Sequence, residues 1–284
     1  MSLSRDDQRI CDLLRLPPGP VDLTAIDTNA KPGFDGDKSD GKEELPELGD
    51  ELADLQEKLF AEGYTGGSRR VLLVLQGMDT SGKGGVLSHT VGLLDVTGLA
   101  LKSFKKPTEE ELAHDFLWRV ERALPAAGEI GIFDRSHYED VLIAKVHQLA
   151  APEEIERRYD AINDFEQRLA ADGTAIIKCM LHVSADEQRK RLLARLDDPT
   201  KQWKFKPGDV DERGHWAEYR AAYETALERC NTEIAPWYVV PSDRKWYRNW
   251  AIARLLLETL RSMALRWPDP DYDVAEQRAR LETA

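Results

Sequence analysis

Cysteine and long apolar runs are both scarce in this sequence. Its three cysteines, Cys11, Cys179 and Cys230, are widely spaced and odd in number, which argues against a disulfide framework and against a zinc site. No stretch approaches the ~20 apolar residues that a membrane-spanning helix needs, and the first residues lack the apolar core of a signal peptide. We therefore expect a cytoplasmic protein that has no membrane partner.

Excess positive charge is also lacking, since 39 Lys and Arg stand against 52 Asp and Glu and give a formal net charge of −13. This balance argues against a nucleic-acid partner, because such proteins need a basic face. The charge is uneven, however: residues 35–57 and 269–282 are acidic, whereas residues 189–206 hold seven Lys or Arg and two Asp. The basic stretch predicts a site for a specific polyanion, although a solvated helix face would have the same composition.

Apolar runs and helical patterns alternate along most of the 284 residues. Strands are predicted at 71–76, 99–104, 129–133, 175–183 and 236–240. Helices are predicted at 45–64, 82–95, 109–123, 137–148, 152–172, 184–196, 214–230 and 244–266. The alternation predicts an α/β fold with three layers, in which helices cover both faces of a parallel five-stranded sheet. We expect an extended N-terminal arm over 1–45, one domain over 46–267 and a charged tail over 268–284.

A glycine-rich segment follows the first predicted strand and precedes a predicted helix. Its sequence, GMDTSGKGG over residues 77–85, fits the spacing G-x-x-x-x-G-K. Glycines at these positions let backbone N–H groups approach an anion at the positive end of the helix. The segment therefore predicts a phosphate-binding loop in which Lys83 adds a positive charge. The backbone contacts are expected from Gly77, Thr80, Ser81, Gly82, Gly84 and Gly85.

The position after Lys83 departs from the usual loop. Gly84 stands where a Ser or Thr hydroxyl would bind Mg²⁺. Asp79, inside the loop, is the candidate replacement, because Mg²⁺ is commonly held by one or two carboxylates together with waters and phosphates. The alternative is a turn aspartate that bonds its own backbone.

A second charged pair, Asp134 and Arg135, follows the third predicted strand. The carboxyl ends of parallel strands share one edge of the sheet, so we expect this pair beside the glycine-rich segment. Asp134 is a candidate Mg²⁺ ligand and Arg135 a candidate for bidentate phosphate binding. The alternative is an ordinary strand end with Ser136 as a helix cap.

The basic stretch predicts a mobile lid over about 189–213. Arg191 and Arg195 lie four residues apart on a predicted helix, so both could reach one anion. Lys201, Lys204 and Lys206 alternate with aromatic residues and are expected to follow a polyanion. Lid closure would exclude water from a phosphoryl transfer. A purely structural Trp-Phe anchor is the alternative.

The stretch after the second predicted strand is a candidate nucleotide site. Its predicted helix begins with a capping box formed by Thr108 and Glu111, which explains part of the pattern without any function. Phe116 and Trp118 would equally suit a core. The candidate nucleotide-binding residues are Lys106, Asp115, Trp118 and Arg119.

Five motifs give the chain a resemblance to the second family of polyphosphate kinases, over residues 64–267. They are GMDTSGKGG, SFKKPTEEELAHDFLWR, GIFDRSHYEDVL, DPTKQWKF and APWYVVPSDRKWYRNW. The resemblance implies a P-loop kinase fold similar to thymidylate kinase, with a helical lid, and dimers or tetramers. It also implies Mg²⁺-dependent transfer, with Mn²⁺ as a substitute metal. The residues that match the family's catalytic positions are Asp79, Lys83, Asp134, Arg135 and, in the lid, Arg195.

The resemblance implies reversible transfer of the terminal phosphoryl group of inorganic polyphosphate to AMP or ADP, with ATP as a product and GMP and GDP as further acceptors. Two alternatives stay open. An ATP-dependent nucleotide kinase could share the fold, because fold alone does not fix the donor. A non-catalytic phosphate-binding module is the other, and the combination of Asp79, Lys83, Asp134 and Arg135 argues against it.

Overall fold

The sheet at the centre of the fold has five parallel strands. A computed structural model describes residues 9–284. The strands are β1 (Arg70–Gln76), β2 (Leu99–Ser103), β3 (Ile130–Asp134), β4 (Thr174–His182) and β5 (Trp237–Pro241). Their order is β2-β3-β1-β4-β5, and every pairing is parallel. The central strand is β1, as its unbroken apolar run requires, because both faces of such a strand are buried.

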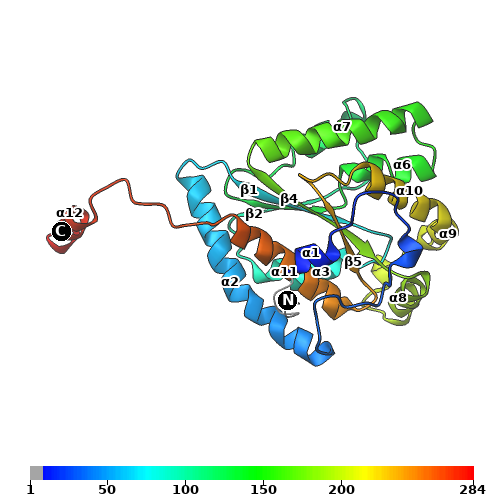
Figure 1. The fold of residues 1–284 in the computed structure, drawn as a ribbon, viewed down its shortest axis with the longest axis horizontal. Helices are drawn as coiled ribbons and strands as arrows, with labels where there is room; N and C mark the ends of the chain where they lie inside the picture. The colour runs from blue at the N-terminus through cyan, green and yellow to red at the C-terminus, as the bar shows by residue number, and fades with distance from the viewer. Residues whose placement is uncertain (1–8) are drawn as a thin grey trace, which may run out of the picture.

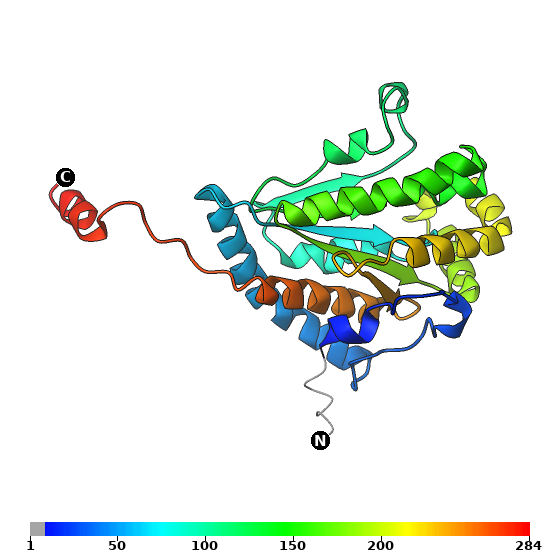
Figure 2. The same ribbon diagram turned by 45° about the horizontal axis from the view of Figure 1, so that its top comes forward.

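Helices cover both faces of the sheet (Figures 1 and 2). On one face, Leu73 and Leu75 of β1 pack in a core with α2 (Lys38–Tyr64), α3 (Lys83–His89) and α11 (Lys245–Ser262). On the other face, Leu72 and Val74 pack in a core with α7 (Pro152–Ala171) and α10 (Trp216–Arg229). This arrangement confirms the predicted three-layer α/β/α fold with a parallel sheet.

The remaining helices are short or lie near the carboxyl edge of the sheet. They are α1 (Ile10–Leu14), α4 (Glu109–Leu112), α5 (Trp118–Glu121), α6 (Ile143–Val146), α8 (Ala185–Asp197), α9 (Gly208–Gly214) and α12 (Val274–Glu282). The last of these lies apart from the body of the fold at the end of an extended segment (Figure 1). Within residues 9–284, no helix is both long and apolar enough to span a membrane.

Several predicted helices differ from the observed ones. The prediction at 109–123 is broken into α4 and α5, because Asp115 caps the N–H of Leu117 with its side chain between them. The prediction at 137–148 becomes a 3-10 turn, His137–Asp140, followed by α6. The prediction at 45–64 begins too late: α2 starts at Lys38, where Asp37 and Asp40 form a capping box.

The described part of the predicted arm packs against the body of its own chain. Before α2 begins at Lys38, within the range predicted as arm, its regular elements are α1 and a 3-10 turn, Leu23–Ala25. The N–H groups of Ile10 and Cys11 donate to the Glu258 carboxylate of α11 at 2.9 and 3.0 Å. Apolar side chains of the arm, including Leu14, are buried in the two cores. Residues 1–8 of the predicted arm lie outside the described part of the chain.

Candidate functional site

The segment of residues 77–85, here called the glycine loop, joins β1 to α3 at the carboxyl edge of the sheet. Gly77 and Gly82 have φ values of 148° and 117°, in the region that favours glycine. A Cβ on Gly77 would lie 2.7 Å from the carbonyl oxygen of Leu181, so the loop also needs glycine for its close approach to β4. The local backbone therefore has the geometry that the sequence pattern predicts.

Lys83 begins α3 and folds back over the loop. Its Nζ donates to the carbonyl oxygen of Gly77 at 2.8 Å. Burial lowers the pKa of the Lys83 ammonium, as does the nearby positive charge of Arg135, whereas the carboxylates of Asp79 and Asp134 oppose that shift. Lys83 and the two predicted carboxylates thus share one electrostatic environment. A bound phosphate would offset the desolvation of this ammonium.

Arg135 links the glycine loop to the end of β3. Its guanidinium lies 3.1 Å from Asp79 and 3.8 Å from Glu139. Burial opposes its charge, but the carboxylates of Glu139 and Asp79 more than offset this effect and raise its pKa. The residue has a φ of 64°, which is uncommon outside glycine and frequent at functional sites. The predicted meeting of the two motifs at this edge is therefore observed.

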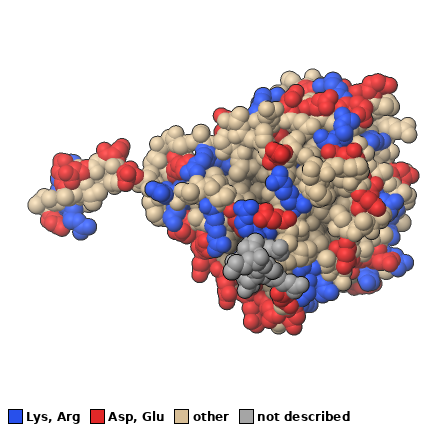
Figure 3. All heavy atoms as spheres, in the orientation of Figure 1, with Lys and Arg blue, Asp and Glu red and all other residues tan. Residues whose placement is uncertain are grey.

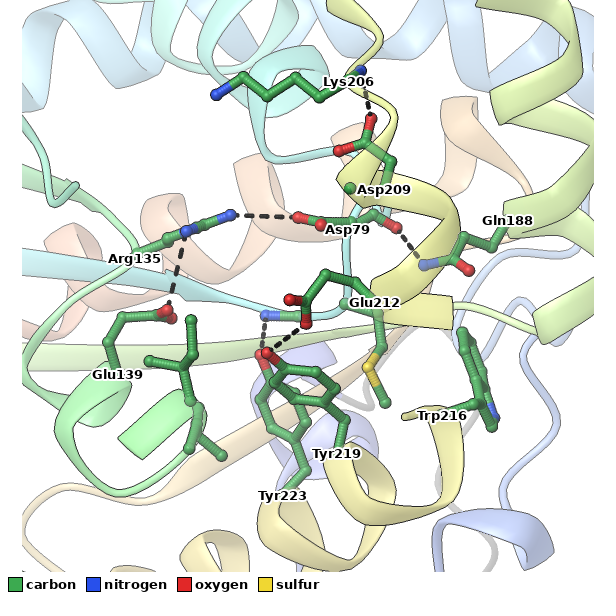
Figure 4. Close-up of a pocket in the computed structure, with 15 residues that line it drawn as sticks. Asp79, Arg135, Glu139, Gln188, Lys206, Asp209, Glu212, Trp216, Tyr219 and Tyr223 are labelled. Carbon is green, nitrogen blue, oxygen red and sulfur yellow. Dashed lines mark hydrogen bonds and ion pairs between the residues drawn. The ribbon is translucent and has the colours of Figure 1, made fainter. Parts of the chain in front are cut away.

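A cavity of about 300 Å³ opens beside the glycine loop (Figure 4). One wall comes from Asp79 of the loop and from Arg135 and Glu139 after β3. The opposite wall comes from the segment between α8 and α10 and from α10 itself. Its charged and aromatic residues are Lys206, Asp209, Glu212, Trp216, Tyr219 and Tyr223. The cavity thus lies between the loop and the predicted lid.

The wall of the cavity opposite the glycine loop, here called the lid wall, is connected to that loop by hydrogen bonds. Gln188 of α8 donates from its Nε2 to the carbonyl oxygen of Asp79 at 2.9 Å. Arg213 of α9 donates to the Gln188 Oε1 at 2.6 Å. On the other side, the N–H of Gly77 donates to the Tyr223 hydroxyl at 3.0 Å. Movement of the lid wall is therefore coupled to the position of the loop.

Carboxylates outnumber cations around this cavity. Asp79, Glu139, Asp209 and Glu212 face Arg135 and Lys206. Burial raises the pKa of Glu139, although the charges of Arg135 and Lys83 oppose that shift. The sequence reasoning gave no role to Glu139, Asp209 or Glu212. Glu139 stands inside the motif GIFDRSHYEDVL, which was the only available signal for it.

The donor set beside Lys83 fits Mg²⁺. Asp79 accepts from Arg135 through Oδ1, and its Oδ2 has no hydrogen-bond partner within residues 9–284. Asp134 accepts from the Ser103 hydroxyl through Oδ2 at 3.2 Å, and its Oδ1 is likewise without a partner in that range. No group of three or more His, Cys, Asp or Glu in the described chain could hold a metal ion alone. Two carboxylates suffice for Mg²⁺ when substrate phosphates and waters complete its shell.

Arg191 of α8 holds the backbone of the glycine loop through hydrogen bonds. Its guanidinium donates to the carbonyl oxygens of Thr80 and Ser81, at 2.9 Å each, and to those of Ser242 and Asp243. It also pairs with Glu187. The sequence predicted direct anion binding shared with Arg195, but these contacts commit the Arg191 side chain to the loop backbone. Arg195 lies 3.7 Å from Asp209, near the cavity and apart from Arg191's partners.

Arg248 of α11 is a second support that the sequence reasoning did not single out. Its guanidinium donates to the Ser81 carbonyl oxygen at 3.1 Å and to the Asn249 Oδ1. It is buried and forms no ion pair with a carboxylate in the described part of the chain. Burial lowers its pKa to about 9, yet a guanidinium still keeps its proton at neutral pH. The loop therefore rests on two buried guanidinium groups.

The three predicted lid lysines differ in their surroundings. Lys206 lines the cavity beside the glycine loop. Lys201 pairs with Asp198, and Lys204 lies over the ring of the exposed Trp203 at 5.0 Å from its centroid. Polyanion binding by Lys201 and Lys204 therefore stays a prediction.

The candidate nucleotide residues do not line this cavity. Arg119 is buried, lies 3.1 Å from Asp140 and donates to the carbonyl oxygen of Lys105, so we assign it to holding this segment on the fold. Trp118 stacks on His114 with ring centroids 4.1 Å apart. Asp115 caps the N–H of Leu117, and Lys106 is exposed. Nucleotide binding by Lys106, Asp115 and Trp118 stays a prediction.

Comparisons with known proteins bear on this site. The family model described as Polyphosphate kinase 2 matches residues 35–267. The chain is 45% identical over 255 residues to a Meiothermus ruber protein named AMP/ADP-polyphosphate phosphotransferase, covering 90% of this chain and 94% of the relative. It is 40% identical over 261 residues to an ADP-polyphosphate phosphotransferase of Rhodopseudomonas palustris, covering 88% and 89% of the two chains.

Solved structures give the same result for the fold. The crystal structure of polyphosphate kinase 2 from Arthrobacter aurescens matches with a TM-score of 0.95 and 53% identity, covering 98% of each chain. A putative polyphosphate kinase 2 from Pseudomonas aeruginosa matches with a TM-score of 0.77 and 30% identity, covering 85% of this chain and 50% of that one.

Proposed function

The chain belongs to the polyphosphate kinase 2 family, and from this membership and the geometry of the glycine loop we propose that it transfers phosphoryl groups between inorganic polyphosphate and nucleotides. The donor is the terminal phosphoryl group of polyphosphate, the acceptor is AMP or ADP, and the reaction is reversible. The single observation that carries the proposal is the convergence of Lys83, Asp79 and Arg135 at the carboxyl edge of the sheet.

The proposed step is an in-line displacement at phosphorus. A phosphate oxygen of the acceptor forms a bond to the terminal phosphorus, while the bond from that phosphorus to its bridging oxygen breaks. The shortened polyphosphate leaves with the electron pair of that oxygen. Because the acceptor phosphate is already ionised at neutral pH, no protein group has to remove a proton. No covalent intermediate with the protein is needed.

The chain's own residues supply positioning and charge. The loop amides and Lys83 neutralise the donor phosphates, and Arg135 and Arg195 stabilise the charge on the transferring group. Asp79 and Asp134 are the residues that would hold Mg²⁺, which when bound neutralises phosphate charge and orients the oxygens. Lid closure would exclude water that otherwise competes as an acceptor.

The names of the relatives support both acceptors. AMP and ADP appear together in the name of the Meiothermus ruber protein, and ADP alone in that of the Rhodopseudomonas palustris protein. We propose that this chain accepts both, with GMP and GDP as further acceptors and Mn²⁺ as a substitute metal. A cytoplasmic location and a dimeric or tetrameric state remain predictions of the sequence and the resemblance.

The direct test measures nucleotide products from AMP and, separately, from ADP with polyphosphate and Mg²⁺, using ATP as the competing donor. We expect ADP and ATP from AMP, and ATP from ADP. Lys83→Ala and Asp134→Asn should each lower kcat by about 100-fold or more and leave the unfolding transition close to that of the wild type. Lys83 is expected to neutralise phosphate charge in the transition state, and Asp134 would hold Mg²⁺. Their loss should therefore lower kcat without lowering stability.

Each other outcome has a definite reading. Product from ADP alone would support polyphosphate as the donor and would restrict the acceptor to ADP. Turnover with ATP and none with polyphosphate would replace the proposal with an ordinary nucleotide kinase. Binding of polyphosphate without turnover by the wild type would indicate a non-catalytic module.

A further inference from the structure

A second cavity lies outside the site above. It has a volume of about 700 Å³ and is lined by the first half of α2, the end of α3 and the turn between β5 and α11. Its cationic lining residues are Lys38, Lys42, Arg244 and Lys245, and His89 also lines it. We call this space the α2 cavity. Nothing in the proposed transfer step uses it.

The lysines of the α2 cavity are unpaired. Lys38, Lys42 and Lys245 form no ion pair or hydrogen bond within residues 9–284. The two lining carboxylates, by contrast, are engaged: Glu187 pairs with Arg191 at 2.9 Å. Asp243 accepts from the Ser184 N–H and the Thr28 hydroxyl. The cavity therefore presents positive charge that the fold leaves uncompensated.

The sequence of α2 sorts its charges between two sides. Lys38 and Lys42 are four residues apart, so they share a helical face, and both line the cavity. Like Lys38 and Lys42, the neighbouring acids Asp40, Glu43 and Glu47 are exposed, but they do not line the cavity. Figure 3 shows Asp and Glu gathered over the first half of α2 on the outer surface of the molecule. An otherwise acidic segment thus turns its lysines toward the cavity.

One layer of side chains separates the α2 cavity from the glycine loop. Asn249 lines the cavity and accepts from Arg248, which in turn donates to the Ser81 carbonyl oxygen of the loop. Ser88 and His89, at the end of α3, also line it. They lie about 7.5 and 9 Å along this helix from Lys83, at 1.5 Å per residue.

Lys245, which lines the α2 cavity, lies within the electrostatic reach of the two arginines that support the glycine loop and of Glu187. Burial and the neighbouring charges of Arg191 and Arg248 lower the pKa of the Lys245 ammonium. Lys201 of the predicted lid contributes in the same direction. The cations open to a chain of phosphates that extends beyond the glycine loop are the lysines that line the α2 cavity.

We infer that the α2 cavity binds the distal phosphates of a long polyphosphate whose terminal group is held at the glycine loop. The inference rests on the proposed function and adds to it a second contact region for the donor. A linear polyanion fits because its repeating charge can contact several unpaired lysines at once, whereas a short donor would end before reaching them. The α2 cavity would then set a preference for long chains.

The test is a double variant, Lys42→Ala with Lys245→Ala, compared with Lys58→Ala on the same helix. Lys58 pairs with Asp54 and does not line the cavity, so its loss removes a positive charge from the same helix outside the cavity, and Lys42→Ala alone gives the comparison at equal change of charge. We would measure kcat and KM with long-chain polyphosphate, and the affinity of inorganic tripolyphosphate as a substrate or competitor. Isothermal titration with each polyphosphate gives a readout that does not depend on turnover.

We expect the double variant to raise KM and Kd for long-chain polyphosphate by about three- to ten-fold. Its kcat and its affinity for tripolyphosphate should stay near wild type, and its binding of long chains should depend less on salt. Lys58→Ala should behave as wild type. Equal weakening of both polyphosphates, or no change in either, would overturn the inference.

Two further outcomes separate the inference from the function on which it rests. If the wild type binds polyphosphate without using it, the transfer proposal fails while the titrations still report on the α2 cavity. If the double variant has a lower affinity for ATP and an unchanged affinity for both polyphosphates, the cavity is a nucleotide site and the inference is wrong.

Discussion

Arg248 carries a buried positive charge that the fold holds against the glycine loop. A Cβ on Gly85 would lie 2.5 Å from its Nη2 atom, and a Cβ on Gly82 would overlap its Nη1 atom. These contacts explain two of the loop's glycines by packing and not by backbone conformation alone. The adjacent Gly84 differs, because a Cβ there would meet nothing within 4 Å.

This contrast gives a prediction for two neighbouring glycines. Gly85→Ala should lower the free energy of unfolding by about 1–3 kcal/mol, because the guanidinium of Arg248 is buried and cannot move away without losing its hydrogen bonds. Gly84→Ala should be neutral or stabilise by up to about 1 kcal/mol, because alanine suits a helix better than glycine. Urea denaturation of both variants measures the difference. Equal stability of the two would show that Arg248 does not restrain Gly85.

For individual residues, the sequence predicts which side chains lie close together, but not which hydrogen-bond partners an arginine has. The convergence of Asp79, Lys83 and Arg135 followed from motifs at the ends of parallel strands, which must share an edge. Arg119 and Arg191 were expected to bind ligands, and in the structure both donate to backbone carbonyl groups of the protein. The sequence does not show whether an arginine side chain binds a phosphate or a carbonyl oxygen of the protein. Only the packing of distant segments decides between these two partners.

Helices α8 and α9 act together on the glycine loop. Arg213 of α9 donates to the carbonyl oxygen of Ala185 and to the Gln188 side chain, and Gln188 in turn donates to the Asp79 carbonyl oxygen. The adjacent Glu212 of α9 pairs with His147 and accepts from the Tyr219 hydroxyl. A single hydrogen-bonded path therefore runs from the predicted lid to a candidate metal ligand.

Arg213→Ala should loosen this path. We expect faster hydrogen exchange in residues 208–214 and near Asp79, because α9 loses two hydrogen bonds, and a loss of about 1–2 kcal/mol in unfolding free energy. The KM for polyphosphate should rise, since closing the lid would then require more ordering. Arg189→Ala is the control, because its pair with Asp186 on α8 is exposed and reaches neither α9 nor the loop. Unchanged exchange in Arg213→Ala would contradict the coupling.

At the scale of elements, strands were predicted more closely than helices. All five lie within one residue of their predicted bounds, because buried parallel strands read as continuous apolar runs with sharp ends. The start of α2 was predicted too late, since the acidic, glycine-containing residues 35–44 resemble disorder and only the Asp37–Asp40 capping box shows their helical state. The break between α4 and α5 depends on a single Asp115 cap, which periodicity does not register.

The N-terminal segment packs across the body of its own chain. From the sequence, the arm could equally wrap a neighbouring subunit or lack order, because its prolines and charges give no periodicity. The described part instead runs across the body of its own chain, where Arg15 forms a bridge with Tyr238 of β5 and Leu16 donates to Trp237. The carbonyl oxygen of Leu23 lies 2.9 Å from the ring of His182 at the end of β4. The arm therefore supports the edge of the sheet that carries the site.

Deletion of residues 1–22 should therefore destabilise the isolated chain. The deletion removes Ile10, Leu14 and Leu16, all buried, and at about 1.5–3 kcal/mol each their loss is on the order of 5 kcal/mol. This amount is comparable to the whole stability of many domains, so the truncated chain is expected to unfold. Leu14→Ala, which should cost about 2–4 kcal/mol, tests the same packing in a chain that still folds.

Urea denaturation at several protein concentrations, with mass measured in solution, separates packing within one chain from exchange between chains. If the arm packs on its own subunit, the loss in Leu14→Ala will be the same at every concentration. A loss that grows on dilution would mean that the arm packs on a neighbouring chain in the assembled protein. Unchanged stability of Leu14→Ala would mean that the segment contributes little, and the glycine loop would then rest on α8 and α11 without help from the arm.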